Sequence, residues 1–323
     1  MRNGGYWDRV PISYRNPVFP DYFADPFVFR APEGYVAVGT GAIVDGRAFQ
    51  VLVSDDLVNW RRVGGALELL PAEAGTDYWA PEVAEHDGRW WMYYSLGIED
   101  RGHHLRLAVA DSPTGPYRDQ GVDLSPDERF AIDPCPFRDE DGTWYLFHAR
   151  DVLEGDRVGT MLAVDVLDGM TKLRGGPRTI LQPSGDWQIF KRQREMYGQV
   201  YDWHTLEGPA VVRHDGRYYC FYSGGSYLES SYGVAYAVAD HPLGPWTEPE
   251  GVPPLIQTIP GHVVGPGHNS VVEGPDGRHV MVYHAWDAEQ TARRMCIDPI
   301  VWTADGPRVL GPSYEPVDLS RTG

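Results

Sequence analysis

Three acidic residues open short apolar segments that resemble one another. They are Asp25 in ADPFVF, Asp133 in IDPCPF and Glu207 in EGPAVV. Two carboxyl groups are sufficient to hydrolyse a glycosidic bond, because one protonates the leaving oxygen while the other activates water or attacks the anomeric carbon. A third acid can raise the pKa of the group that must stay protonated. Its place in the pattern makes Asp133 the acid expected to perturb Glu207.

The acids belong to a pattern that recurs five times, in copies that read ADPFVFRAPEGYVAVGT, WAPEVAEHDGRWWMYYS, IDPCPFRDEDGTWYLFHA, EGPAVVRHDGRYYCFYS and HNSVVEGPDGRHVMVYHAW. Each copy predicts a strand, a glycine-containing turn and an aromatic strand with alternating apolar residues. Counting back nine residues from the turn glycines Gly34, Gly88, Gly142, Gly216 and Gly277 gives Asp25, Trp79, Asp133, Glu207 and His268.

Further strand-like segments, such as FQVLVSDDLVNW and LRLAVADSPTGPY, follow most copies. A repeat of about 50 to 70 residues that supplies about four strands is typical of a propeller blade. We therefore predict an all-β fold, a five-bladed β-propeller that forms one domain over residues 1–323. Because the innermost strands line the channel, the ring of equivalent positions should hold three acids, one tryptophan and one histidine.

A structural interpretation of the acids is also open, since Asp before Pro is a common turn former. One such copy would be weak support for a site. Three acids at equivalent positions around a channel repel one another, however, and this cost favours a functional interpretation.

A sugar site also needs aromatic side chains, because sugar rings present apolar C–H faces that stack on them. Trp79 has the expected ring position, although a tryptophan in a β-protein is more often a core residue. Weaker candidates for substrate contacts are Tyr78, Trp187, Trp203 and Trp286.

The composition excludes several classes of function. A formal charge of −18 disfavours binding to nucleic acid or to anionic membranes, and no run of 18 apolar residues occurs. Cys135, Cys220 and Cys296 have no metal-site or disulfide spacing, which predicts buried free thiols. The opening MRNGGYWDRVPISYRNPVFP lacks the apolar run of a signal peptide, so we expect a cytoplasmic protein. The oligomeric state is not predicted.

The acidic motifs NPVFPDYFADPFVF, AIDPCPF and HTLEGPAVV, together with YWAPEV and GHNSVV, resemble glycoside hydrolase family 43 along nearly the whole chain. The resemblance implies a five-bladed propeller and an inverting mechanism. Asp25 would be the general base, Glu207 the general acid, and Asp133 the acid that tunes and orients Glu207.

The resemblance carries further expectations. No cofactor is needed for the chemistry, but His268 would face a channel that holds a structural Ca²⁺ or another cation. Arg294, next to Arg293, would reach the sugar hydroxyls. The C-terminal β-sandwich of the family's two-domain xylosidases is expected to be missing, and the segment 171–201 should form a loop over the pocket that favours exo-action.

Together these points predict an exo-acting α-L-arabinofuranosidase that takes small arabino- or arabinoxylo-oligosaccharides from plant cell-wall polysaccharide. β-Xylosidase and endo-1,5-α-L-arabinanase remain alternatives. A non-catalytic carbohydrate-binding propeller is the alternative from another class, since a fold does not establish an activity. A phosphorylase or transferase has only the KRQR run at 191–194 in its favour.

Overall fold

The computed structural model describes residues 12–319 of the chain, and the eleven residues that open the sequence lie outside this range. The described part is built from strands and two 3₁₀ turns, at Ala72–Ala74 and Asp186–Gln188, and contains no α-helix. No helix within residues 12–319 has the length and hydropathy needed to cross a membrane. The prediction of an all-β protein is confirmed.

Five groups of mainly antiparallel strands follow one another along the chain, and the third and fourth groups are joined in one ten-stranded sheet. Blade 1 consists of β2 (Ala24–Ala31), β3 (Gly34–Thr40), β4 (Arg47–Ser54) and β5 (Arg61–Glu68), and blade 2 of β6 (Asp77–His86), β7 (Arg89–Ile98), β8 (Arg101–Ala110) and β9 (Arg118–Asp123). Blade 3 consists of β10 (Ala131–Arg138), β11 (Trp144–Val152), β12 (Gly159–Asp168), β13 (Lys172–Leu173) and β14 (Arg178–Leu181), and blade 4 of β15 (Ile189–Met196), β16 (Gln199–His214), β17 (Arg217–Gly224), β18 (Gly233–Ala239) and β19 (Ile256–Gln257). Blade 5 consists of β20 (Val264–Glu273), β21 (His279–Trp286), β22 (Arg293–Thr303) and β23 (Gly306–Val309).

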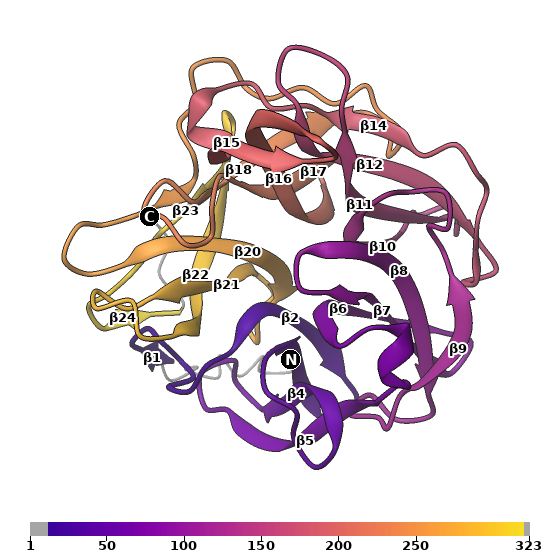
Figure 1. Ribbon diagram of the computed structural model, residues 1–323. Coiled ribbons are helices and arrows are strands. Elements are labelled where there is room, and N and C mark those ends of the chain that lie inside the picture. The colour runs from indigo at the N-terminus through magenta and orange to yellow at the C-terminus, as the bar shows by residue number, and fades with distance from the viewer. Residues whose placement is uncertain (1–11, 320–323) are drawn as a thin grey trace, which may run out of the picture.

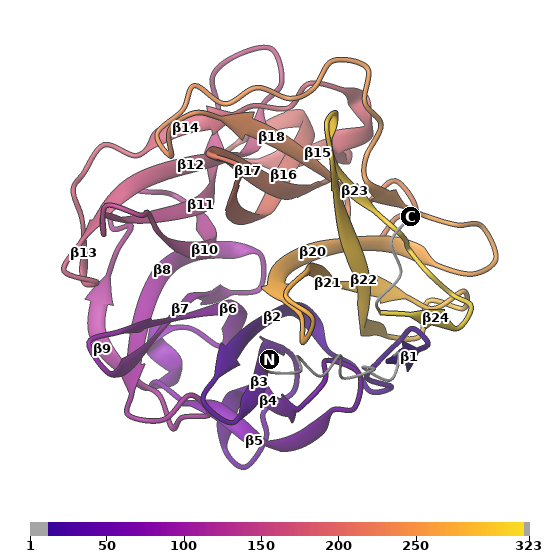
Figure 2. The same cartoon turned by 180° about the vertical axis from the view of Figure 1, so that it is seen from behind.

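The sheets surround one axis as the blades of a propeller, with β2, β6, β10, β16 and β20 innermost (Figures 1 and 2). Blades 3 and 4 are also joined by a short parallel pairing of β12 with β16, Gly159 to His204 and Thr160 to Thr205. The five-bladed architecture predicted from the repeats is therefore present.

Each junction between neighbouring blades is filled by its own apolar cluster. Alternation along the strands sends one set of side chains to the preceding blade and the other set to the next. At the junction of blades 1 and 2, for example, Val38 and Phe49 pack with Met92, Tyr94 and Tyr117. The three cysteines are buried free thiols within these clusters, as the sequence predicted.

The circle closes where the two ends of the described chain meet. β1 (Ser13–Tyr14) pairs with β24 (Val317–Asp318), Ser13 opposite Asp318. The segment between β1 and β2 then runs beside blade 5, where Val18 N–H donates to the Met295 carbonyl at 2.9 Å and Phe23 N–H to the Arg293 carbonyl at 2.9 Å. This closure joins blade 1 to blade 5.

The innermost strand of every blade carries a β-bulge, where its pairing register with the second strand shifts. The first residue of each bulge has a left-handed backbone, with φ of 49° at Asp25, 46° at Ala80, 58° at Asp133, 56° at Gly208 and 47° at His268. Bulges re-aim side chains and are common next to active sites. Here they set the contents of the channel.

These bulges correct the predicted ring. The equivalent positions hold Asp25, Ala80, Asp133, Gly208 and His268, so Trp79 and Glu207 stand one residue before the ring position. The cause is the place of the counted glycine relative to each turn. Blades 2 and 4 use two-residue turns, with His86 paired to Arg89 and His214 to Arg217. The glycine of these two blades is the second turn residue. In blade 1 Gly34 comes one residue later, paired with Ala31, and blades 3 and 5 use longer turns, so a count from the glycine differs by one residue.

Candidate active site

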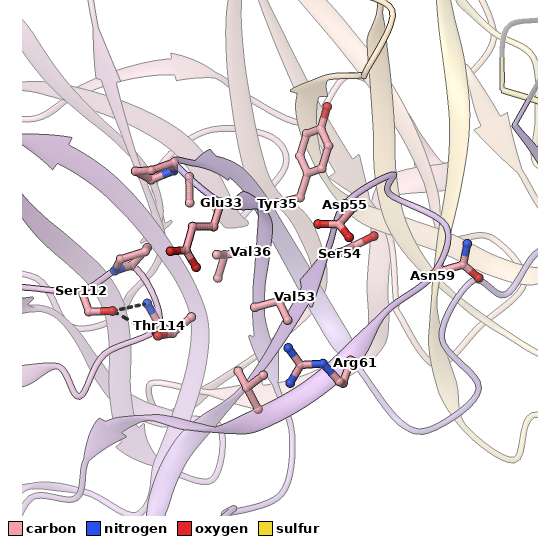
Figure 3. Close-up of a pocket in the computed structure, with 14 residues that line it drawn as sticks. Glu33, Tyr35, Val36, Val53, Ser54, Asp55, Asn59, Arg61, Ser112 and Thr114 are labelled. Carbon is pink, nitrogen blue, oxygen red and sulfur yellow. Dashed lines mark hydrogen bonds between the residues drawn. The ribbon is translucent and has the colours of Figure 1, made fainter. Parts of the chain in front are cut away.

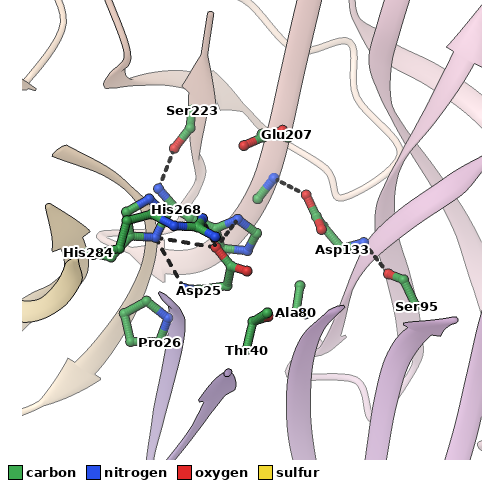
Figure 4. A network of polar contacts seen from close by, with 12 residues as sticks. Asp25, Pro26, Thr40, Ala80, Ser95, Asp133, Glu207, Ser223, His268 and His284 are labelled. Carbon is green, nitrogen blue, oxygen red and sulfur yellow. Dashed lines mark hydrogen bonds and ion pairs between the residues drawn. The ribbon is translucent and has the colours of Figure 1, made fainter. Parts of the chain in front are cut away.

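Asp25 lies at the bulge of β2, surrounded by nitrogen atoms from blade 5. Its Oδ1 is 3.4 Å from His268 Nδ1, 3.3 Å from His284 Nδ1 and 3.3 Å from Arg293 Nη1. Burial raises the pKa of Asp25, but His268, Arg293 and His284 outweigh it and hold the pKa well below its usual range. Asp25 is thus a charged carboxylate and can accept a proton (Figure 4).

Glu207 and Asp133 form the second acidic group, across the channel from the histidines in Figure 4. Burial raises the pKa of Glu207 to about 7, opposed by a hydrogen bond from Tyr232 and assisted by Asp25. Burial and the neighbouring Glu207 raise the pKa of Asp133 well above its usual range. A buried pair of this kind retains a proton near neutral pH. The site therefore combines one proton acceptor with a pair that can donate.

The structure brings together the three acids that the sequence singled out, and it adds a tyrosine that the sequence reasoning missed. The Tyr232 hydroxyl donates to Glu207 Oε1 at 2.5 Å. Tyr232 is fully buried, and its ring stacks on His284 with the centroids 5.9 Å apart. It therefore fixes the orientation of the Glu207 carboxyl and stabilises its charged form.

The choice between two neighbouring arginines is corrected. Arg293 points toward Asp25, and its Nη2 also donates to Tyr22 Oη at 2.7 Å. Arg294 points the other way, donating through Nε to the Pro20 carbonyl at 2.7 Å and pairing with Asp287. Consecutive residues of β22 face opposite sides of the sheet, and the pairing of Arg293 with Trp286 sets which one faces the site.

Aromatic rings surround the Arg293 guanidinium. Its Cζ lies 4.5 Å from the centroid of Tyr227, 5.6 Å from Tyr22 and 6.0 Å from Trp286. The Trp286 indole donates to the Tyr227 carbonyl at 2.7 Å. Trp286, a weaker candidate in the sequence, thus belongs to the wall next to Asp25.

A cavity of about 670 Å³ opens beside Glu207. Its wall includes Trp79, Trp203, Phe190 and Tyr227. Trp79 stacks on His103 at 3.6 Å, and Trp203 is almost completely buried below the guanidinium of Arg194, at 5.5 Å. Both predicted tryptophans therefore form the pocket wall. The volume is in the usual range for small-molecule sites.

The segment predicted as a covering loop is more regular than expected. It contains β13, β14 and β15, and β15 forms a hairpin with β16 whose residues Phe190, Lys191, Arg194 and Met196 line the cavity. Arg194 Nη2 reaches Asp100 Oδ2 of the β7–β8 turn at 2.7 Å, which bridges the cavity rim between blades 2 and 4. The basic run is engaged by acids, since Arg192 also pairs with Asp186 and Asp202.

Tyr78 and Trp187 lie elsewhere. The Tyr78 hydroxyl accepts from Leu70 N–H at 2.9 Å, and its ring packs against Phe49 and Tyr94 between blades 1 and 2. Tyr78 is thus a core residue, which corrects its assignment to substrate binding. Trp187 packs against the cluster between blades 3 and 4.

His268 is buried, and burial lowers its pKa although Asp25 opposes the shift. Within residues 12–319, no three His, Cys, Asp or Glu side chains are arranged to hold a metal ion. Calcium prefers six to eight oxygen ligands, so a single imidazole would need water to complete the shell. A channel cation remains a prediction.

A second cleft, of about 640 Å³, lies at the ends of β2 and β3 that their turn joins, away from Asp25 at the other end of β2 (Figure 3). It is lined by the β2–β3, β4–β5 and β8–β9 connections, which carry Glu33, Asp55, Asn59 and Ser112. None of the three catalytic candidates lines it, and it offers no tryptophan for a sugar ring. The chemistry is therefore centred on the channel.

Comparison with known proteins agrees with this geometry. The family model described as "Glycosyl hydrolases family 43" matches residues 14–307. The chain belongs to this family. Family 43 enzymes hydrolyse O-glycosyl bonds, and the present family 43 chain is a glycoside hydrolase.

Its relatives have several specificities. A β-D-galactofuranosidase of Aspergillus niger is 28% identical over 90% of this chain and 83% of its own length. An extracellular exo-α-(1→5)-L-arabinofuranosidase of Streptomyces avermitilis is 24% identical over 91% of this chain, which spans 62% of that enzyme. The crystal structure of a thermostable family 43 glycoside hydrolase superposes with a TM-score of 0.83 at 33% identity, covering 96% of this chain and 100% of that one.

Proposed function

We propose that this family 43 enzyme is an inverting, exo-acting α-L-arabinofuranosidase that removes terminal arabinose from small arabino- or arabinoxylo-oligosaccharides. The observation that carries the mechanism is the opposite tuning of Asp25 and Glu207. The pKa of Asp25 is lowered by its cationic and imidazole neighbours, and that of Glu207 is raised by burial to about 7. One enzyme then holds a charged base and a protonated acid at the same pH.

In the proposed step Asp25 takes a proton from a water molecule, and that water attacks the anomeric carbon. Glu207 gives its proton to the glycosidic oxygen as the bond to the leaving sugar breaks. The three nitrogen contacts converge on Oδ1 of Asp25, so we assign the proton to Oδ2. Attack from the face opposite to the leaving group inverts the anomeric centre.

Two observations support the furanoside and the exo-action. The relatives from Aspergillus niger and Streptomyces avermitilis are named as galactofuranosidase and arabinofuranosidase, and both names specify five-membered sugar rings. The β15–β16 hairpin and the bridge between Arg194 and Asp100 restrict the cavity beside Glu207, which favours a pocket for one terminal sugar over a groove for a continuous chain. Action inside the cell remains part of this proposal.

The test compares the p-nitrophenyl α-L-arabinofuranoside, β-D-xyloside and β-D-galactofuranoside, followed by arabino-oligosaccharides. Glu207→Ala and Asp25→Ala should both abolish turnover of oligosaccharides, while Glu207→Ala keeps partial activity on the activated aryl glycoside. Asp305→Asn, whose carboxylate is exposed on the outer β22–β23 turn, is the matched control and should match the wild type.

Proton NMR of the first sugar released reports the anomer directly. Release of arabinose one unit at a time with inverted configuration supports the proposal. Xylose release alone would assign the enzyme as a β-xylosidase, and internal cleavage would assign it as an endo-arabinanase. No cleavage of any substrate by the folded protein would favour a carbohydrate-binding role.

A further inference from the structure

Hydrogen bonds around the channel link each blade to the next. In each blade, one residue of the second strand pairs with the residue that precedes the bulge. From blade 1 to blade 5 these residues are Thr40, Ser95, Ala149, Ser223 and His284. At four junctions this side chain accepts the N–H of the next blade's bulge residue: Ala80 to Thr40 Oγ1 at 2.9 Å, Asp133 to Ser95 Oγ at 3.0 Å, His268 to Ser223 Oγ at 2.7 Å and Asp25 to His284 Nδ1 at 3.1 Å (Figure 4).

The junction of blades 3 and 4 departs from this rule. The ring position there is Ala149, whose methyl group cannot accept a hydrogen bond. The N–H of Gly208, the bulge residue of blade 4, donates instead to Asp133 Oδ2 at 2.9 Å. Because a buried N–H without a partner is costly, another group must take it where the ring lacks an acceptor. That group is one of the three acids of the site.

We propose that Ala149 is a positioning residue, which withholds a side-chain acceptor from Gly208 and so commits the Asp133 carboxylate to that N–H. Asp133 is then held at both ends, because its own N–H is bonded to Ser95 and its carboxylate to Gly208. Gly208 directly follows Glu207 in the chain. The same hydrogen bond therefore ties the tuning acid to the backbone of the proton donor.

The local structure explains how this arrangement is held. Gly208 has a left-handed backbone, and a Cβ at this position would lie 3.2 Å from the His268 ring, so the chain passes close to the channel there. Ala149 is fully buried in the cluster between blades 3 and 4. A donor on a carboxylate favours its charged form. Without this donor Asp133 would hold its proton still more readily, so the pair would place its proton on Glu207 less often.

Ala149→Ser restores the acceptor that the other junctions have. Its hydroxyl should take the Gly208 N–H and free Asp133, which lowers the pKa of Glu207. The alkaline limb of the pH profile of kcat/KM should then move down by about one pH unit. Ala163→Ser places the same hydroxyl on β12 of the same blade, where Ala163 is equally buried and pairs with His148, and it should leave the limb in place.

A second readout follows the Gly208 amide itself. Labelling with carbonyl-¹³C glutamate and ¹⁵N-glycine selects the five Glu–Gly pairs of the chain, which include Glu207–Gly208. In the wild type this amide should shift with pH as a partner of a carboxylate. The shift should disappear in Asp133→Asn and in Ala149→Ser, and it should persist in Ala163→Ser.

The outcomes separate this inference from the proposed function on which its catalytic part rests. If the Gly208 amide does not titrate in the wild type, or still titrates in Ala149→Ser, the assignment of Ala149 is wrong whatever the enzyme cleaves. If the amide changes as expected while the alkaline limb stays fixed, the positioning role is wrong. The amide measurement needs no substrate, so a wrong choice of sugar cannot obscure it.

Discussion

Removing the hydroxyl of Tyr232 should move the alkaline limb of activity upward. This hydroxyl donates to Glu207 Oε1 and lowers the pKa of the carboxyl, which burial otherwise raises. Tyr232→Phe keeps the ring, its stacking on His284 and its contact with Gly267, where no Cβ would fit. The change therefore removes one donor and little else.

The size of the shift follows from the strength of that bond. A hydrogen bond to a charged group contributes about 1.5 to 3 kcal/mol, and one pKa unit corresponds to about 1.4 kcal/mol. Loss of the bond should raise the pKa of Glu207 by about one to two units. Since the acid must be protonated to act, the wild type loses activity as pH rises through about 7. The variant should lose activity about one to two pH units higher, near pH 8 to 9.

The assay is kcat/KM on an unactivated oligosaccharide from pH 4 to 10, measured for the wild type and Tyr232→Phe. Tyr283→Phe is the matched control, because Tyr283 is equally buried and its hydroxyl donates to Asp298 at 2.7 Å, in blade 5. That control should lower the melting temperature and leave the limb near pH 7. A limb in Tyr232→Phe that stays in place or moves down would refute the assigned role of Tyr232.

Two further expectations concern the arginine pair and the closure. Arg293→Ala should raise the pKa of Asp25, move the acid limb of the pH profile upward and reduce kcat/KM by roughly 100-fold. Arg294→Ala removes the ion pair with Asp287, worth about 0 to 1 kcal/mol, and should keep the wild-type pH profile. Equal effects of the two changes in pH–rate measurements would contradict this. Gly311→Ala should lower the free energy of unfolding by about 1 to 3 kcal/mol, because the added Cβ would lie 2.1 Å from Asp298 Oδ2. Gly185→Ala is the control and should lower it less, because its Cβ would meet only the Trp187 side chain, at 3.2 Å. Urea unfolding of the two variants measures the difference.

The repeats were sufficient to predict the propeller, because strand alternation and turn chemistry are local properties of the sequence. The residue of each innermost strand that reaches the channel could not be predicted from local sequence properties. The counted glycine lies at different places relative to its turn, so the count assigned Trp79 and Glu207 to ring positions that the next residues, Ala80 and Gly208, occupy. The bulges could have been found by aligning the copies at ADP, WAP, IDP, EGP and GHN instead of at the turn.

Other features depended on contacts that the sequence carries only weakly. Alternation predicts that one of Arg293 and Arg294 faces the site, but the phase is set by pairing with Trp286. Tyr232 lies in a connection, 25 residues after the acid it contacts, and no motif marks it. The acceptors Thr40, Ser95 and Ser223 were visible, since they end three of the repeat copies, and Ala149 ends a fourth.

The pairing of Ser13 with Asp318 also sets an order of events during synthesis. These partners are 305 residues apart, so at 5 to 20 residues per second the first waits roughly 15 to 60 s for the second to be made. During that interval Tyr14, Phe19 and Phe23 have no Met295, Ile297 or Leu319 to cover them. The nascent protein therefore exposes these apolar side chains until blade 5 has been synthesised. This is the period in which a chaperone would protect it most from aggregation.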